Sequence, residues 1–218
     1  LPEVQAVVNH YKPVFLKQKI ERISNPNSYS KVFATHTLPK LNKNVGGQLI
    51  KDVFRRGKYI VLQTEKGYLC IHLRMTGQLQ ESLDSFVADK HCSFAIHLNK
   101  GKTIYFKDYR KFGRLYYYST LDTLNAKLGV EPFSTEFSFV YVAGILKKSA
   151  GMIKPLLLNQ KYIAGLGNIY VDEALWLAKI HPKKKSNSIS KTKVKVLTRS
   201  IPDILKKAID FNGTTIIN

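Results

Sequence analysis

The sequence has few cysteines and no long hydrophobic run, and each absence excludes a class of protein. Cys70 and Cys92 are the two cysteines of the 218-residue chain, too few for a disulfide framework or a four-cysteine zinc site. No run of about 18 apolar residues is present, so an ordinary transmembrane helix is excluded. The segment Leu1–Pro13 lacks a basic start followed by an apolar stretch and does not resemble a signal peptide. We expect a cytoplasmic protein with no membrane partner.

Acidic residues are also scarce. The 15 Asp and Glu residues are outnumbered by 35 Lys and Arg, which gives a formal charge of +20 at pH 7. Such an excess destabilises a folded chain through self-repulsion unless a polyanion neutralises it, and nucleic acid is the commonest such partner. Compositional drift would also account for the charge, because 28 of the basic residues are lysines, and so would binding to a ribosome or a membrane surface. The 44% of hydrophobic residues can form a core, which argues against disorder.

The first half of the chain has the pattern of a β-rich domain with an opening helix. Pro2 suits a first helical position, and Val4, Val7, Val8 and Tyr11 follow at helical spacing. Short apolar segments separated by polar turns then favour an antiparallel sandwich or barrel. Strands are predicted at residues 58–65, 68–73, 92–98, 103–106 and 115–118.

The second half has helical periodicity. Helices are predicted over residues 137–148, 154–159, 168–179 and 192–211. The apolar faces of the last two are predicted to include Leu175 and Trp176, and Val196, Ile201, Ile204 and Leu205. The lysine-rich segment 183–190 is expected to be a solvated loop. With a boundary near Pro132, the fold class is α+β: an N-terminal antiparallel β-sandwich domain with an opening helix, residues 1–130, then an all-α domain, residues 131–218.

Residues 160–173 contain a candidate phosphate site. Gly165 and Gly167 separate two helical stretches, and Asn168 is placed to cap the second. The free N–H groups at a helix N-terminus favour an anion, and on so basic a chain a phosphodiester is the obvious one. Lys154 could supply a second phosphate contact. The structural alternative for the glycine segment is an ordinary connection between two helices, and the alternative for Lys154 is a lysine that is simply exposed.

Basic and aromatic residues alternate in the segment Lys107–Arg114, which follows a predicted strand. Arg110 could bind base edges, and Phe112 could wedge between stacked bases. The alternative places Phe112 in the core and Arg110 in solvent. His72 and Met75 lie at the end of another predicted strand, where a methionine is more often part of the core.

Lys58 is a candidate general acid. Gly57 permits a tight turn, after which Lys58 would begin a strand. Burial lowers the pKa of a lysine, whereas a nearby phosphate favours its charged, proton-donating form. The spacing alone supports this role only weakly.

Taken together and in order, these segments resemble the formamidopyrimidine-DNA glycosylase family of base-excision repair enzymes. The resemblance covers essentially the whole chain, and the start at Leu1–Glu3 favours the purine-specific branch over the relatives that prefer oxidised pyrimidines. It is carried by residues 1–4, 56–58, 72–77, 108–113, 164–170, 180–182 and 213–215.

The resemblance implies a glycosylase that flips a damaged purine, such as 8-oxoguanine or a formamidopyrimidine, out of the duplex. It also implies AP lyase activity, with strand cleavage through a Schiff base by β- and δ-elimination. The expected partner is double-stranded DNA containing damaged purines or abasic sites, and a monomer near the bacterial nucleoid is expected. The second domain would then be a helix–two-turn–helix domain. A noncatalytic damaged-DNA-binding module and a general basic architectural protein are the alternatives.

The resemblance also assigns roles to individual residues. Lys58 matches the proton donor of the elimination steps, and Glu3 matches a family glutamate near the active site. Three residues match those that fill the vacated helix and probe the opposite base: Met75, Arg110 and Phe112. Four match DNA-backbone contacts: His72, His91, Lys154 and Asn168.

Two departures from the family pattern carry expectations of their own. The family's nucleophilic proline and its neighbouring glutamate would precede Leu1, and Pro2 aligns with a different proline. The four-cysteine zinc ribbon would follow Asn218, so we expect no metal or cofactor in this chain and zinc in the ribbon of the intact family. We therefore expect the 218-residue chain by itself to be inactive and to bind DNA weakly.

Overall fold

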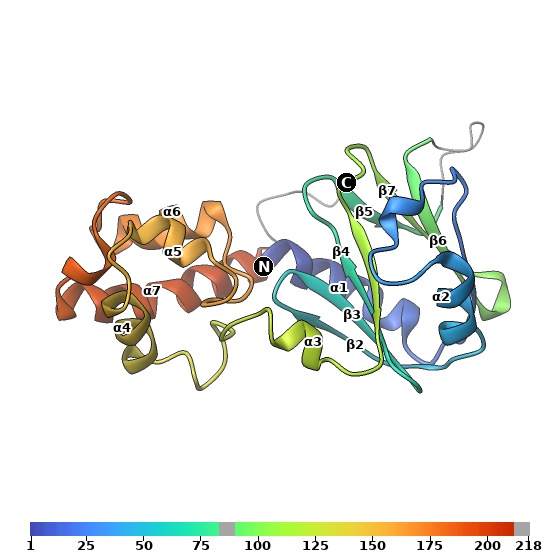
Figure 1. Ribbon diagram of the computed structural model, residues 1–218, viewed down its shortest axis with the longest axis horizontal. Helices are drawn as coiled ribbons and strands as arrows, with labels where there is room; N and C mark the ends of the chain where they lie inside the picture. The colour runs from blue at the N-terminus through green and yellow to red at the C-terminus, as the bar shows by residue number, and fades with distance from the viewer. Residues whose placement is uncertain (83–89, 212–218) are drawn as a thin grey trace. The chain divides into compact units, whose positions relative to one another are not determined.

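The computed structural model describes residues 1–82 and 90–211. The chain forms two compact units (Figure 1). The β unit comprises Val7–Leu121, and the helical unit comprises Leu1–Ala6 together with the chain from Asp122 onward. The 213–215 motif lies outside the described residues.

The β unit contains two four-stranded antiparallel sheets, and it confirms the predicted sandwich with an opening helix. The helices are α1 (Pro2–Phe15), which begins at the predicted proline in the helical unit and belongs to this unit from Val7 onward, and α2 (Leu38–Val45). The first sheet has the order β1 (Ile20–Ser24), β6 (Cys92–Leu98), β7 (Thr103–Asp108), β5 (Gly77–Gln80). The second has the order β2 (Ile50–Arg56), β3 (Tyr59–Thr64), β4 (Tyr68–His72), β8 (Arg114–Tyr118).

The strands that the sequence pattern revealed have buried side chains at half or more of their positions. In β7 every second side chain is buried, and the Phe106 ring stacks on Phe94 of β6 at 4.7 Å between centroids. The pattern did not reveal β1, β2 or β5. Irregular registers at Ile20/Arg22 in β1 and at Ile50/Asp52 in β2 break the alternation on which the prediction relied.

The helical unit contains the four predicted helices and the short α3 (Asp122–Asn125). Serine side chains cap two of them, with Ser138 accepting from the Tyr141 N–H and Ser190 from the Lys193 N–H. Their buried faces form one core cluster. The helices are α4 (Phe139–Lys147), α5 (Ile153–Leu158), α6 (Asn168–Leu177) and α7 (Lys191–Asp210).

Two expectations about apolar faces were wrong. Trp176 is 82% exposed, whereas its neighbour Leu175 is 2% exposed. The buried face of α6 follows Tyr170, Val171, Ala174 and Leu175, and Trp176, about 100° further around the helix than Leu175, lies outside that face. Val196 of α7 is likewise 40% exposed.

Asn168 does not cap α6. Gly167, in extended conformation, is the N-cap and contributes no side-chain hydrogen bond, and Asn168 is the first helical residue.

Among the described residues, none of the helices combines the length and apolar character needed to span a membrane.

Candidate nucleic-acid interface

Two neighbouring loops of the β unit expose the residues expected to probe a duplex. Met75, between β4 and β5, is 71% exposed, and Phe112, between β7 and β8, is 47% exposed. The Arg110 guanidinium carbon lies 4.8 Å from the centroid of the Phe112 ring. Because neither Met75 nor Phe112 is in the core, the alternative of two packing residues is wrong.

A buried carboxylate, that of Asp108, holds these two loops together. Its Oδ1 accepts a hydrogen bond of 2.5 Å from the Thr76 hydroxyl, beside Met75, and one of 3.2 Å from the Arg110 N–H. Its Oδ2 accepts one of 2.6 Å from the Gly113 N–H. Asp108 was not among the residues predicted from the sequence. The signal that could have found it is an Asp two residues before Arg110 at a strand end, which favours a turn closed by the Asp side chain.

Both loops contain backbone in the left-handed region immediately before a residue that is expected to probe the duplex. Arg74 (φ 58°) precedes Met75, and Lys111 (φ 55°) precedes Phe112. Such conformations are uncommon outside glycine and persist where the surrounding contacts impose them. On the Lys111 loop such contacts include the hydrogen bonds to Asp108 and those that the Lys111 carbonyl accepts from Tyr29 and Arg114.

His72 and Lys58 form a second group in the β unit, beside the Met75 loop. His72 ends β4 and pairs across the sheet with Tyr59, its ring 4.7 Å from the tyrosine ring. Burial, and then the positive charges of Arg74 and Lys58, lower the pKa of His72 to about 3. Its Nδ1 accepts from the Arg74 N–H at 3.1 Å, so a neutral ring carries its proton on Nε2. Lys58 follows Gly57 in the turn between β2 and β3 and is half-buried.

His91 is attached to the base of the Arg110 loop. Its carbonyl accepts the Asp108 N–H at 2.8 Å, and its ring lies 4.6 Å from the ring of exposed Tyr109.

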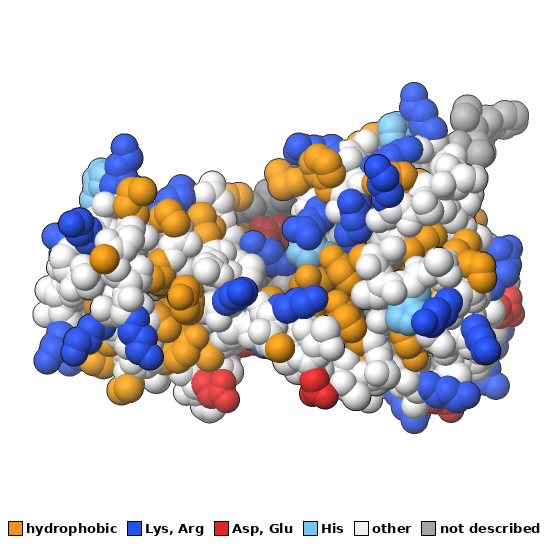
Figure 2. All heavy atoms as spheres, in the orientation of Figure 1, with side chains coloured by type: hydrophobic (Ala, Val, Ile, Leu, Met, Phe, Trp, Pro, Cys, Tyr) orange, Lys and Arg blue, Asp and Glu red, His pale blue; other side chains and the backbone are white. Residues whose placement is uncertain are grey.

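The structure therefore brings six of the expected residues into one region of the β unit. They are Lys58, His72, Met75, His91, Arg110 and Phe112. Figure 2 shows many Lys and Arg side chains and few acidic ones on the visible face of this unit.

The helical unit places Lys154 and Asn168 on either side of a glycine turn. Gly165 has φ 85°, and Gln160 holds the turn by accepting the Gly165 N–H at 2.8 Å and donating to the Leu166 carbonyl at 2.9 Å. Asn168 then begins α6. Lys154 of α5 forms an ion pair of 2.8 Å with Asp172 of α6.

Glu3 belongs to the same unit and contacts α6. Its Oε1 accepts a hydrogen bond of 2.6 Å from the Tyr170 hydroxyl. Burial by itself would raise the pKa of Glu3, but this hydrogen bond and a backbone hydrogen bond lower it, and the pKa lies below its ordinary value. Glu3 is therefore a carboxylate at neutral pH.

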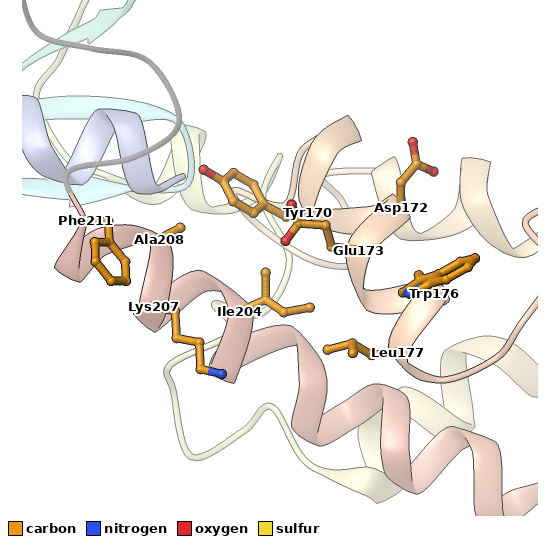
Figure 3. Close-up of a pocket in the computed structure, with 9 residues that line it drawn as sticks. All are labelled: Tyr170, Asp172, Glu173, Trp176, Leu177, Ile204, Lys207, Ala208 and Phe211. Carbon is orange, nitrogen blue, oxygen red and sulfur yellow. The ribbon is translucent and has the colours of Figure 1, made fainter.

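Tyr170 also lines an open groove between α6 and α7 (Figure 3). Trp176 and Leu177 line it on α6, and Phe211, 82% exposed, lines it directly after the end of α7. The groove is mainly apolar, with Asp172, Glu173 and Lys207 as its charged residues.

The described residues do not form a zinc site. Cys70 and Cys92 are buried cysteines on different sheets, the Cys92 thiol donates to the Phe94 carbonyl at 3.4 Å, and burial raises the pKa of Cys70 to about 12. No group of three or more His, Cys, Asp or Glu that could hold a metal occurs in residues 1–82 and 90–211.

A β sandwich with two loops held by Asp108, in one chain with a helical unit that has a glycine turn between α5 and α6, has the architecture of the helix–two-turn–helix class of DNA glycosylases. Family models agree. The model of the formamidopyrimidine-DNA glycosylase N-terminal domain matches residues 1–115, and that of the formamidopyrimidine-DNA glycosylase H2TH domain matches residues 128–218. The chain belongs to the formamidopyrimidine-DNA glycosylase family.

Individual relatives support the same assignment. The formamidopyrimidine-DNA glycosylase of Protochlamydia amoebophila is 39% identical over 217 residues, which cover 99% of this chain and 78% of the relative. The crystal structure of the Lactococcus lactis enzyme, noncovalently bound to DNA containing an AP site, has a TM-score of 0.89 at 36% identity and covers 98% of this chain and 83% of that one. A structure of MutM with DNA containing carbocyclic 8-oxo-G has a TM-score of 0.90 at 37% identity, covering 100% and 82%.

Proposed function

We propose that the protein removes oxidised or ring-opened purines from duplex DNA and cleaves the strand at the resulting abasic site by β- and δ-elimination. The observation that carries the proposal is the exposure of Met75, Arg110 and Phe112 on two loops joined by buried Asp108. Solved structures of relatives with DNA containing an AP site, 8-oxo-G or Fapy-dG support the substrate class.

The two loops are suited to base flipping. Unstacking a base pair costs roughly a few kcal/mol per step, and apolar side chains inserted into the gap offset that cost. Met75 and Phe112 supply the apolar surface. Arg110, oriented over the Phe112 ring, supplies N–H donors for the base left without a partner.

The proposed phosphate contacts come from both units. His72, neutral at physiological pH, can donate from Nε2 to a phosphate oxygen without the repulsion of a further charge beside Lys58 and Arg74. His91 and Asn168 add hydrogen-bonding groups. Lys154 can exchange Asp172 for a phosphate, because a partly exposed ion pair contributes only about 0–1 kcal/mol.

Lys58 is proposed as the proton donor of the elimination steps, and Glu3 as the family's carboxylate near the active site. The turn between β2 and β3 fixes the Lys58 backbone beside His72, whose low pKa keeps it from competing as an acid at neutral pH. General acid catalysis contributes about 100-fold or more. Replacement of Lys58 by Gln is therefore expected to lower the rate of strand cleavage at 8-oxoguanine by about 100-fold or more. The rate is measured with the protein as its gene encodes it.

Damage recognition is tested by equilibrium binding of the chain to two 30-base-pair duplexes, one undamaged and one with a tetrahydrofuran abasic-site analogue. Arg110→Ala and Phe112→Ala are expected to remove the preference for the abasic duplex while leaving undamaged binding nearly unchanged. Arg199→Ala and Phe133→Ala, which also remove an exposed arginine and an exposed aromatic, serve as controls.

Equal weakening on both duplexes would instead favour a general basic architectural protein. A preference for the abasic duplex without cleavage or borohydride trapping on any damaged purine would favour a noncatalytic damaged-DNA-binding module.

A further inference from the structure

The lysine-rich segment expected to be a plain solvated loop is attached to the helical unit by a backbone ladder. Residues 149–154, which connect α4 to α5 and include the first two residues of α5, run antiparallel to residues 182–187. Ser186 is 1% exposed, and both its N–H and its hydroxyl donate to the Gly151 carbonyl at 2.9 Å. The other backbone contacts are Asn187 N–H to Ser149 O at 3.2 Å, Ile153 N–H to Lys184 O at 2.9 Å and Lys154 N–H to Pro182 O at 3.3 Å.

This ladder places several lysines on one surface. The lysine surface consists of Lys147 and Lys148 at the end of α4 and of Lys183, Lys184 and Lys185, all of them exposed. The ladder joins the two groups, because Ser149 follows Lys148 and pairs with Asn187. Its other end is Lys154, the proposed phosphate contact. Figure 2 shows Lys and Arg side chains gathered on the visible face of the helical unit.

Local acidic residues do not neutralise this surface along the chain. Neither residues 137–171 nor residues 174–202 include an Asp or Glu. Asp172 and Glu173 lie between these ranges, and Asp172 is the partner of Lys154. Five like charges on adjoining backbone segments repel one another, and a polyanion removes that repulsion. A lysine is a flexible point charge, which suits phosphates whose positions vary with sequence and bending.

We propose that the lysine surface binds phosphates of duplex DNA beyond those contacted at the lesion, extending the footprint of the helical unit from Lys154. This inference rests on the proposed function, since it takes the same duplex as the partner. The surface contacts backbone only, so it strengthens binding to damaged and undamaged duplex alike and holds the protein on DNA during its search.

The test compares the chain with the triple variant Lys183→Gln, Lys184→Gln, Lys185→Gln on the two 30-base-pair duplexes, from 50 to 300 mM salt. Each lost phosphate contact lowers the slope of log K against log salt by about 0.9, so the slope is expected to fall by about 2 to 3. Affinity at 100 mM salt is expected to fall about 10-fold or more, by the same factor on both duplexes. The matched control is Lys31→Gln, Lys40→Gln, Lys43→Gln, which removes three exposed lysines of the β unit.

A slope for the triple variant equal to that of the matched control overturns the inference. The inference is also overturned if the triple variant loses binding only to phosphatidylserine vesicles or only to single-stranded RNA, because the partner would then be a membrane or RNA. The proposed function fails in a different way, when the wild-type chain shows no preference for the abasic duplex. Circular dichroism and thermal midpoints identify loss of fold, which three exposed substitutions are not expected to cause.

Discussion

Asp108 accepts hydrogen bonds from three groups in two loops, although its side chain is buried. Hydrogen bonds to a charged acceptor are among the stronger ones in proteins, and loss of the one from Gly113 would leave a buried donor without its acceptor. Two glycines complete the arrangement, because a Cβ on Gly77 or Gly113 would lie 2.6 or 2.4 Å from the Phe106 ring. We therefore regard Asp108 as a positioning residue for Met75, Arg110 and Phe112.

Replacement of Asp108 by Asn is expected to lower the free energy of unfolding by about 2 kcal/mol, because an amide group would face one of the donors. It is also expected to reduce the preference for abasic over undamaged duplex, which a purely structural residue would leave unchanged. Urea unfolding and the two-duplex binding assay measure the two effects. Asp203→Asn, the same change at an exposed site on α7, should alter neither.

The pH dependence of stability reports on His72. The unfolded chain gains a proton at this residue as pH falls below about 6.5, whereas the folded protein gains it only near the lowered pKa of about 3. The unfolded state therefore binds more protons between these pH values, and the free energy of unfolding falls with falling pH.

His72→Gln is expected to make urea unfolding between pH 7 and pH 4.5 less dependent on pH. Some dependence should remain, because burial also lowers the pKa values of His36 and His97. His10→Gln, at an exposed position, should leave the profile as it is. An unchanged profile for His72→Gln would contradict the lowered pKa.

Among the secondary-structure elements, α6 combines three features. Its buried face packs in the core, its first turn follows the glycine turn, and its outer side exposes Trp176 and Leu177 in the groove with α7. Trp176 is the single tryptophan of the chain, so its fluorescence reports on that groove alone.

Because Trp176 is 82% exposed, its emission maximum is expected to be close to that of free tryptophan in water, with nearly full quenching by acrylamide. Unfolding in urea should then shift the maximum very little. A blue-shifted maximum that moves to longer wavelength on unfolding would show that something covers the groove. Trp176→Phe supplies the blank for tyrosine emission.

At the scale of the whole molecule, the net charge of +20 is a cost to the folded state that salt should relieve. Raising NaCl from 20 to 300 mM reduces the Debye length from about 20 Å to about 6 Å. We expect the thermal midpoint to rise over this range in differential scanning fluorimetry. Sucrose at equal osmolality is the control for non-ionic effects, and a midpoint that falls with salt would be the opposite of this expectation.

The sequence by itself determined the helix and strand types wherever burial follows a regular period, as in β7 and α7, and it determined the family through motifs that stand in order along the chain. It also indicated which positively charged side chains could contact the phosphates of DNA. Local pattern decides these features, because hydrophobic periodicity and turn residues act over a few neighbours.

Only the tertiary structure decided what depends on distant residues meeting. The bulged registers of β1 and β2, the exposure of Trp176 and the Gly167 cap of α6 depend on which neighbours pack against each segment. The role of Asp108 depends on Thr76, 32 residues away, and the lysine surface depends on residues 149–154 pairing with 182–187. A period shows which face of an element is apolar, but contacts across the fold decide what each side chain touches.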